Sequence, residues 1–134
     1  MPFITVAIPT YRRLPLLRRA VESVFAQTFT DWEVVVSDDE APPRGTWNFL
    51  EALARSDRRV RAIMNGSPHG ASFNHTSALE AARGEWIKIL HDADILKPNC
   101  LEILARSSIR NTGLAGLDAK PSKDPARKSS NSRT

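Results

Sequence analysis

Short apolar runs alternate with segments of helical spacing along this chain, and the alternation predicts an α/β fold. The apolar runs are rich in β-branched residues and end at polar or turn-forming residues, which is typical of buried strands. Parallel strands joined by right-handed crossovers give a Rossmann-like, mostly parallel sheet with helices on both faces. The sequence therefore predicts four strand–helix units around one hydrophobic core.

The first two units are predicted in the N-terminal part of the chain. A strand at 3–8 ends at Pro9, and the apolar residues over 14–26 fall on one face of a helix. The strand predicted at 32–36 ends in an acidic run, and Thr46 is a favourable N-cap for the next helix. The apolar face expected of the first helix consists of Leu14, Leu17, Val21, Val24 and Phe25.

The last two units follow the same pattern. A strand is predicted at 59–64, where Asn65-Gly66 ends it. A helix is predicted at 72–83, with Gly84 as its stop. The fourth strand is predicted at 86–90, and Pro98 is favourable at the start of the last helix.

Polar clusters follow three of the predicted strands at the point where each strand ends. They are the segments Pro9-Thr10-Tyr11-Arg12, Ser37-Asp38-Asp39-Glu40 and His91-Asp92-Ala93-Asp94. Ligands of open α/β sheets bind outside the carboxyl ends of the strands, so the fold should bring these clusters onto one rim. Asp92 and Asp94, one residue apart where a strand gives way to a loop, could hold Mg²⁺ or Mn²⁺ beside substrate phosphates.

The positive charge of the chain is concentrated at its C-terminal end. Residues 1–104 hold 12 Lys and Arg against 13 Asp and Glu, whereas residues 105–134 hold 7 against 2. The net charge of +4 therefore gives no reason to expect a specific nucleic-acid partner for the folded part. We expect a folded domain at 1–106 and a disordered, basic C-terminal tail at 107–134, because the tail lacks the apolar pattern of a core.

Cysteine usage and hydropathy give expectations about the compartment. The single cysteine, Cys100, excludes an intramolecular disulfide and fits a reducing compartment. No apolar run approaches 18 residues, so no transmembrane segment is expected, and the N-terminus does not have the pattern of a signal peptide. We expect a cytoplasmic protein, either free or peripheral at the membrane.

Six segments in a fixed order resemble the start of a family 2 glycosyltransferase of the GT-A fold. The resemblance covers residues 3–104, and the ordered set is more specific than the Asp-x-Asp motif alone. The segments are residues 6–13, 20–28, 32–39, 70–74, 82–87 and 91–94.

The resemblance implies a pocket for a nucleoside-diphosphate sugar, with a UDP-sugar expected as the donor. Tyr11 would pack near the base or ribose, Asp39 would accept a hydrogen bond from the base, and Asp38 would shape the loop. A metal, Mn²⁺ or Mg²⁺, would bridge the diphosphate and stabilise the charge on the leaving group. The implied substrate-binding residues are Pro9, Thr10, Tyr11, Arg12, Asp38, Asp39, Asn74 and Asp92, and the implied metal ligands are Asp92 and Asp94.

Several of these residues also have an ordinary structural interpretation. Asp38 and Asp39 could be turn residues, and Arg12 could belong to a solvated helix face. In one register Ala93 occupies a position where the family usually has a metal-binding Asp, which weakens the metal site. In the other register, Asp92 and Asp94 serve together as the two metal ligands, and the metal site is kept.

The resemblance ends before the part in which an inverting family 2 enzyme places its general base and acceptor site. We therefore expect a fragment with impaired transfer, and leave the acceptor open among a glycan, a lipid or a protein. The change of composition near Arg106 is typical of a frameshift or truncation.

Three other interpretations compete with an enzyme. They are a binding module for nucleotides, a phosphorelay receiver domain, and the non-functional product of a broken gene. A phosphorelay receiver domain is disfavoured because its acidic pair would follow the first strand, whereas this chain has Pro9-Thr10-Tyr11 at that position.

Overall fold

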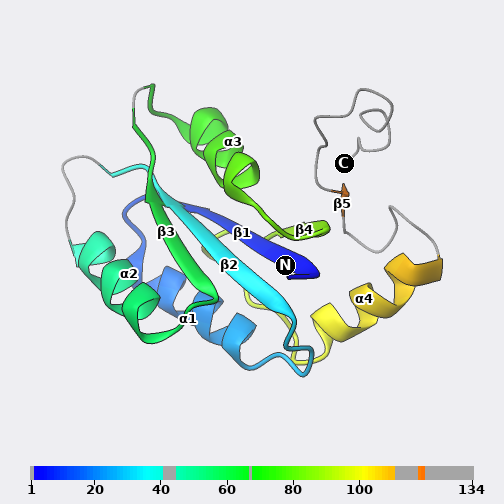
Figure 1. Ribbon diagram of the computed structural model, residues 1–134. Helices are drawn as coiled ribbons and strands as arrows, with labels where there is room; N and C mark the ends of the chain where they lie inside the picture. Colours follow the sequence, from blue (N-terminus) through cyan, green and yellow to red (C-terminus); the bar gives the residue numbers. More distant parts are fainter. Residues whose placement is uncertain (1, 41–44, 67, 111–117, 120–134) are drawn as a thin grey trace.

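The computed structural model describes residues 2–40, 45–66, 68–110 and 118–119, and for residues 108–110 and 118–119 it describes only the backbone. The order of strands and helices confirms the predicted α/β fold (Figure 1). The elements are β1 (Ile4–Thr10), α1 (Leu14–Phe25), β2 (Trp32–Asp38), α2 (Gly45–Ser56), β3 (Val60–Met64), α3 (Ala71–Ala81), β4 (Trp86–Ile89), α4 (Cys100–Arg110) and β5 (Asp118–Ala119).

The described strands form one sheet in the order β3-β2-β1-β4-β5. The first four strands are parallel, and the two residues of β5 pair antiparallel with β4. Because β2 lies on one side of β1 and β4 on the other, the winding direction reverses at β1. In such sheets, the crevice at the carboxyl ends of the strands beside this reversal is where ligands bind.

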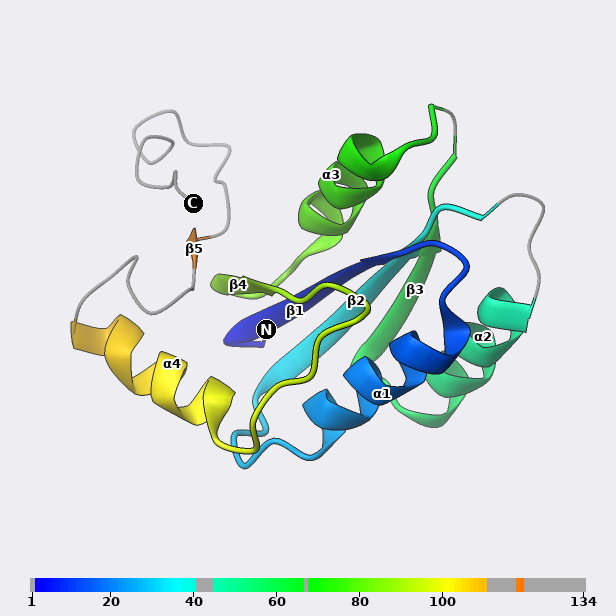
Figure 2. The same ribbon diagram turned by 180° about the vertical axis from the view of Figure 1, so that it is seen from behind.

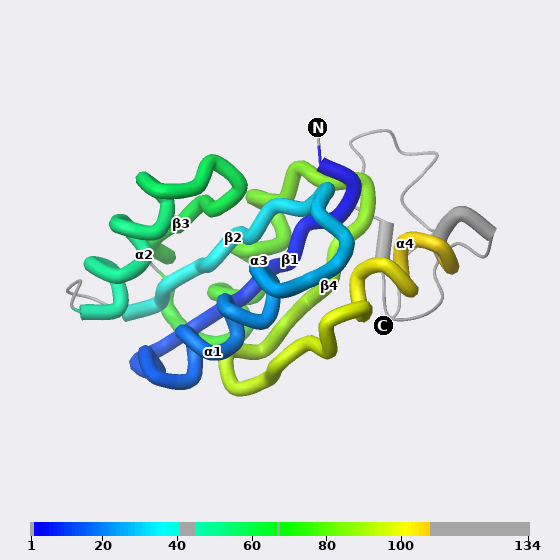
Figure 3. Tube along the Cα trace, turned by 90° about the horizontal axis from the view of Figure 1, so that it is seen from below, coloured from blue at the N-terminus to red at the C-terminus, as the bar shows by residue number. Residues whose placement is uncertain are grey.

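Three helices cover one face of the sheet and one helix covers the other. Helices α2, α1 and α4 lie side by side in that order beneath the strands, and α3 lies above them (Figures 2 and 3). Successive side chains of a strand point to opposite faces, so Ile4, Val6 and Ile8 of β1 enter the core beneath the sheet. Ala7 between them packs with α3 on the opposite face. The prediction of helices on both faces is therefore confirmed.

The face beneath α3 contains a buried acidic residue of β2, Glu33. Its carboxylate accepts hydrogen bonds from the Thr5 hydroxyl at 2.6 Å and the Arg83 backbone N–H at 2.7 Å, and it pairs with Arg61 at 3.0 Å. Burial alone raises the pKa of Glu33, but these hydrogen bonds and the Arg61 charge outweigh it and lower the pKa. Arg61 also donates to the carbonyl of Ala81, so the network attaches the end of α3 to the sheet.

Gly84 stands where the chain returns from α3 to the sheet. The predicted helix at 72–83 ends earlier, at Ala81, so Gly84 is not its terminal cap. A Cβ atom at Gly84 would lie 2.7 Å from the backbone nitrogen of Thr5 and 2.9 Å from the carbonyl carbon of Ile4. The backbone N–H of Gly84 donates to the Thr5 hydroxyl at 2.8 Å. Glycine is required here by close approach to β1.

Two local expectations about the helices are wrong. Phe25 was expected on the buried face of α1, but it is 38% exposed: it is the last residue of the helix, and its ring packs against Trp32 with 5.4 Å between the ring centroids. Thr46 was expected as an N-cap, but it lies inside α2, which already includes Gly45.

The C-terminal part of the chain is described only in part. Helix α4 runs to Arg110, so the domain boundary expected after residue 106 falls within a helix. The rest of the expected tail, apart from β5, lies outside the described residues. Among the described helices, none combines the length and apolar composition that crossing a membrane requires.

Replacing Gly84 with Ala should lower the free energy of unfolding by about 1–3 kcal/mol, because the new methyl group meets backbone atoms that cannot move independently. Urea denaturation measures the effect. Gly66→Ala is the matched control, since a Cβ at Gly66 has no neighbour within 4 Å, and it should change stability by less than about 0.5 kcal/mol. Equal effects of the two substitutions would contradict the close-packing argument.

Candidate functional site

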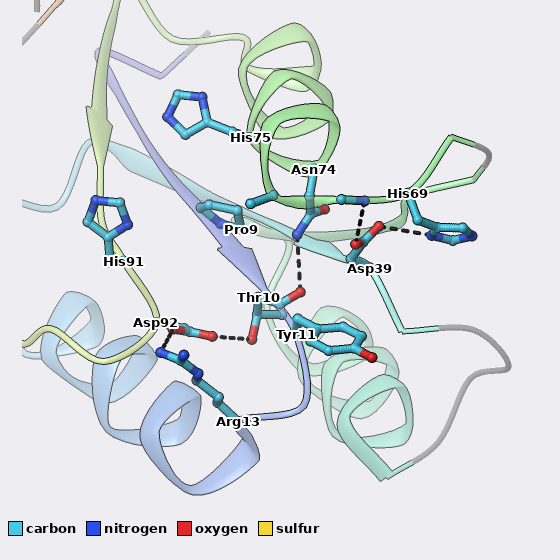
Figure 4. A pocket seen from close by; sticks show the side chains of 12 residues that line it. Pro9, Thr10, Tyr11, Arg13, Asp39, His69, Asn74, His75, His91 and Asp92 are labelled. Atoms are coloured by element: carbon cyan, nitrogen blue, oxygen red, sulfur yellow. Dashed lines mark hydrogen bonds and ion pairs between the residues drawn. The ribbon is translucent and has the colours of Figure 1, made fainter.

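A cavity of about 700 Å³ opens at the carboxyl ends of β1, β2 and β4, beside the first turn of α3 (Figure 4). Its volume lies within the range of small-molecule and cofactor sites. The cavity is lined by Pro9, Thr10, Tyr11, Arg13, Asp39, His69, Gly70, Ala71, Asn74, His75, His91 and Asp92.

Thr10, the last residue of β1, connects the three walls of the cavity. Its hydroxyl donates to Oδ2 of Asp92 at 2.9 Å, which fixes the loop after β4. Its carbonyl accepts from the amide of Asn74 on α3 at 3.1 Å and from the backbone N–H of Asp39 at 3.1 Å. Thr10 and Asn74 are both buried, so these hydrogen bonds are shielded from water.

Asp39 forms one end of the cavity and holds the loop between β3 and α3. Its Oδ1 accepts from the Asn65 amide at 2.6 Å and contacts Nδ1 of His69 at 2.9 Å, while Oδ2 accepts from the Gly70 N–H at 2.9 Å. Burial raises the pKa of Asp39, but these hydrogen bonds outweigh it and lower the pKa. A carboxylate has about four acceptor positions, so Oδ2 retains one for a ligand.

Asp92, His91, His75 and Arg13 form the other end. The guanidinium of Arg13 lies 3.6 Å from Oδ1 of Asp92, and Thr10 occupies Oδ2, so both carboxylate oxygens have a protein neighbour. By contrast, the imidazoles of His75 and His91 have no hydrogen-bond or ion-pair partner among the described residues. Figure 4 shows these two rings on the side of the cavity away from Asp39 and His69.

The structure brings six of the predicted site residues to the cavity and leaves three outside its lining. Arg12 is not part of the lining: it has a left-handed backbone with φ of 56°, its side chain pairs with Glu40 at 3.2 Å, and its guanidinium lies 5.0 Å from the centroid of the Tyr11 ring. Asp38 is fully buried behind the rim, and Asp94 is exposed outside the lining. The six residues in the lining are Pro9, Thr10, Tyr11, Asp39, Asn74 and Asp92.

Asp38 has a structural environment that differs from that of its neighbour Asp39. Burial is the main cause that raises its pKa, and the nearby charges of Glu40 and Asp39 act in the same direction. Its Oδ1 accepts from the Glu40 backbone N–H at 3.0 Å, which shapes the start of the loop, and Oδ2 has no partner among the described residues.

The described residues do not fit a metal held jointly by Asp92 and Asp94. Asp94 lies in a turn in which its backbone N–H donates to the carbonyl of His91 at 3.0 Å, and it is exposed and not part of the cavity lining. Asp92 points inward, but a cation would compete there with the guanidinium of Arg13. Among the described residues, no group of three or more His, Cys, Asp or Glu side chains could hold a metal ion.

Sequence reasoning missed the basic residues of the cavity. Arg13, His69 and His75 were not among the residues predicted for the site. His75 follows Asn74, a predicted site residue, so its position beside the motif was an available signal. For Arg13 the only signal was its place directly after the first rim segment.

Comparison with known sequences gives a consistent family. The model of the family described as glycosyl transferase family 2 matches residues 5–125. A Campylobacter jejuni protein named GalNAc(5)-diNAcBac-PP-undecaprenol beta-1,3-glucosyltransferase is 33% identical over 116 residues, which are 86% of this chain and 37% of that protein. Escherichia coli WfgD, named UDP-Glc:alpha-D-GlcNAc-diphosphoundecaprenol beta-1,3-glucosyltransferase, is 29% identical over 81% of this chain and 42% of its own length. The chain thus spans less than half of these relatives.

Comparison with solved structures gives the same fold. Staphylococcus aureus TarS has a TM-score of 0.69 and 23% identity over 81% of this chain and 20% of that protein, and a shorter form of it was solved with UDP. The mannosyltransferase PcManGT from Pyrobaculum calidifontis, solved with GDP-Man and Mn²⁺, has a TM-score of 0.64 and 25% identity over 78% of this chain and 32% of that protein. The described part of the chain therefore has the GT-A fold of glycosyltransferases.

Replacing Asp39 with Asn should destabilise the protein at neutral pH and much less in acid. The pKa of Asp39 lies below its ordinary value, so its charged carboxylate stabilises the folded state. This contribution is fully present above the unfolded-state pKa of about 3.9 and is lost as the pH falls through the folded-state pKa. We expect a loss of about 1–3 kcal/mol near pH 7, measured by urea denaturation, that shrinks as the pH falls below the unfolded-state pKa of about 3.9.

Asp94→Asn is the control for this substitution. The Asp94 side chain is exposed and has no partner among the described residues, so its replacement should change stability little at either pH. An effect of Asp39→Asn that is the same in acid and at neutral pH would contradict the role of the charged carboxylate.

Proposed function

Because the chain belongs to glycosyl transferase family 2, we propose that its cavity binds a nucleoside-diphosphate sugar as the donor for inverting sugar transfer. The observation that carries this proposal is the arrangement around Thr10. It places Asp39, a hydrogen-bond acceptor for a nucleobase, at one end of the cavity and a group of basic residues at the other. A nucleoside diphosphate has the matching order of groups, with a neutral base at one end and negative charge at the other.

The base is assigned to the end of the cavity formed by Asp39 and Tyr11. The free acceptor position on Oδ2 of Asp39 suits the N–H of a uracil ring, and a base without that N–H would leave the partly buried carboxylate unpaired. Tyr11 lines the cavity and is 48% exposed, and we assign its ring, which has the Arg12 guanidinium 5.0 Å from its centroid, to packing near the base or ribose. The name of WfgD includes UDP-Glc, which supports a UDP-sugar as the donor class.

The transfer step requires groups beyond those of the donor cavity. An acceptor hydroxyl attacks the anomeric carbon, the bond from that carbon to the diphosphate oxygen breaks, and a base takes the hydroxyl proton. The names of two relatives support a lipid-linked saccharide as the acceptor class. No step of this proposal uses Asp92 and Asp94 as a metal site, and that site remains a sequence prediction.

A second candidate function is binding of the nucleotide without transfer. It is favoured by one observation: Asp39 and Asp92, the two carboxylates of the described cavity lining, already have hydrogen-bond or charged neighbours and are poorly placed to act as a base. This candidate agrees with the expectation of impaired transfer. The two candidates differ in release of UDP from UDP-glucose over time, which only an active transferase or hydrolase produces.

UDP should raise the melting temperature of the protein, because a ligand that binds only the folded state adds stability as its concentration exceeds the Kd. Asp39→Asn should weaken UDP binding tenfold or more, since it converts part of a charged acceptor into a donor. Isothermal titration calorimetry measures both affinities.

Glu80→Gln is the matched control, because Glu80 is an exposed carboxylate of α3 outside the cavity lining. It should leave UDP affinity unchanged. Failure of the wild-type protein to bind UDP, or equal affinity in the Asp39→Asn variant, would refute the assignment of the base.

A further inference from the structure

We propose that His75 and His91, together with Arg13, form an anion subsite that binds the diphosphate through side-chain donors in place of a bridging metal ion. The inference rests on the proposed function in one respect, namely that the anion belongs to a nucleotide. The subsite itself is argued from the residues at the end of the cavity opposite Asp39.

The two imidazoles are available to a ligand. His75 is partly buried on α3 and His91 is exposed directly after β4, and both line the cavity. Neither ring has a hydrogen-bond or ion-pair partner among the described residues, whereas the ring of His69 at the other end contacts Asp39 at 2.9 Å. A neutral imidazole donates one hydrogen bond, and a protonated imidazole donates two and carries a positive charge. The pair can therefore donate to oxygens on a bound anion.

The local charge also favours an anion. Asp92 is the one acidic residue among the lining residues at this end, and the Arg13 guanidinium lies 3.6 Å from its Oδ1. The Thr10 hydroxyl donates to the other carboxylate oxygen at 2.9 Å. These two contacts balance the negative charge of Asp92. The histidines add hydrogen-bond donors and have no acidic partner of their own among the described residues. Charge-assisted hydrogen bonds of this kind are about twice as strong as neutral ones.

A diphosphate is the anion that fits the position of these donors. The base is assigned to Asp39 and Tyr11, and the histidines lie on the other side of the same cavity (Figure 4). A nucleotide that spans the cavity would place its phosphates there. Asp92 is the one carboxylate among the described lining residues at this end that a metal could use, and the Arg13 guanidinium already lies 3.6 Å from its Oδ1.

The test uses the wild-type protein and a double variant, His75→Ala with His91→Ala, and measures binding of pyrophosphate, UDP and uridine in EDTA by calorimetry. We expect the wild type to bind pyrophosphate and UDP without metal, and the double variant to bind both at least tenfold more weakly with unchanged uridine affinity. Lys97→Ala is the control, because it removes an exposed positive charge outside the cavity lining, and it should have no effect.

The outcomes separate this inference from the proposed function. If pyrophosphate and UDP bind only when Mn²⁺ is added, or if the double variant binds pyrophosphate as well as the wild type, the anion subsite is refuted while nucleotide binding stands. If pyrophosphate behaves as expected but neither UDP nor uridine binds better than pyrophosphate, the subsite is supported and the proposed function fails.

Discussion

The arrangement of the site depends on the hydrogen bonds of one residue, Thr10. It stands at the end of the central strand, where its carbonyl holds Asn74 of α3 and the backbone of Asp39, and its hydroxyl holds Asp92. These partners lie 64, 29 and 82 residues away along the chain, respectively. Each wall of the cavity is thus positioned against the same strand end. A buried donor or acceptor that loses its partner is costly, which favours this one arrangement.

The sheet makes this arrangement possible. β1 pairs with β2 up to Thr10 and Asp38, and with β4 only up to Ala7 and Ile89, so β4 ends earlier at the rim. The shorter pairing leaves the loop after β4 to fold back toward Thr10. The preformed hydrogen bonds of Asp39 and Asp92 then fix the cavity before any ligand arrives, which lowers the entropy cost of binding.

Much of the fold could be predicted because each strand and helix has a local signal in its apolar spacing. The rim residues Pro9, Thr10, Asp39 and Asp92 could be predicted for a related reason, since parallel strand ends converge at one edge. The position of Asp94 outside the lining could not be predicted, because it depends on the turn after β4, in which the Asp94 N–H bonds to the carbonyl of His91. The roles of His75 and Arg13 depend on how α3 and α1 sit over the sheet, which the sequence pattern does not determine.

Chemical-shift mapping of the ¹⁵N-labelled protein during a UDP titration tests the central claim most directly, because it reports where the nucleotide binds. The backbone amides of Tyr11, Asp39, Gly70, His75 and His91 should show the largest changes, and those near the amino ends of the strands, such as Phe3 and Trp86, should show small ones. Shifts confined to the amino ends of the strands, or no shifts at millimolar UDP, would contradict the account of a nucleotide cavity built around Thr10.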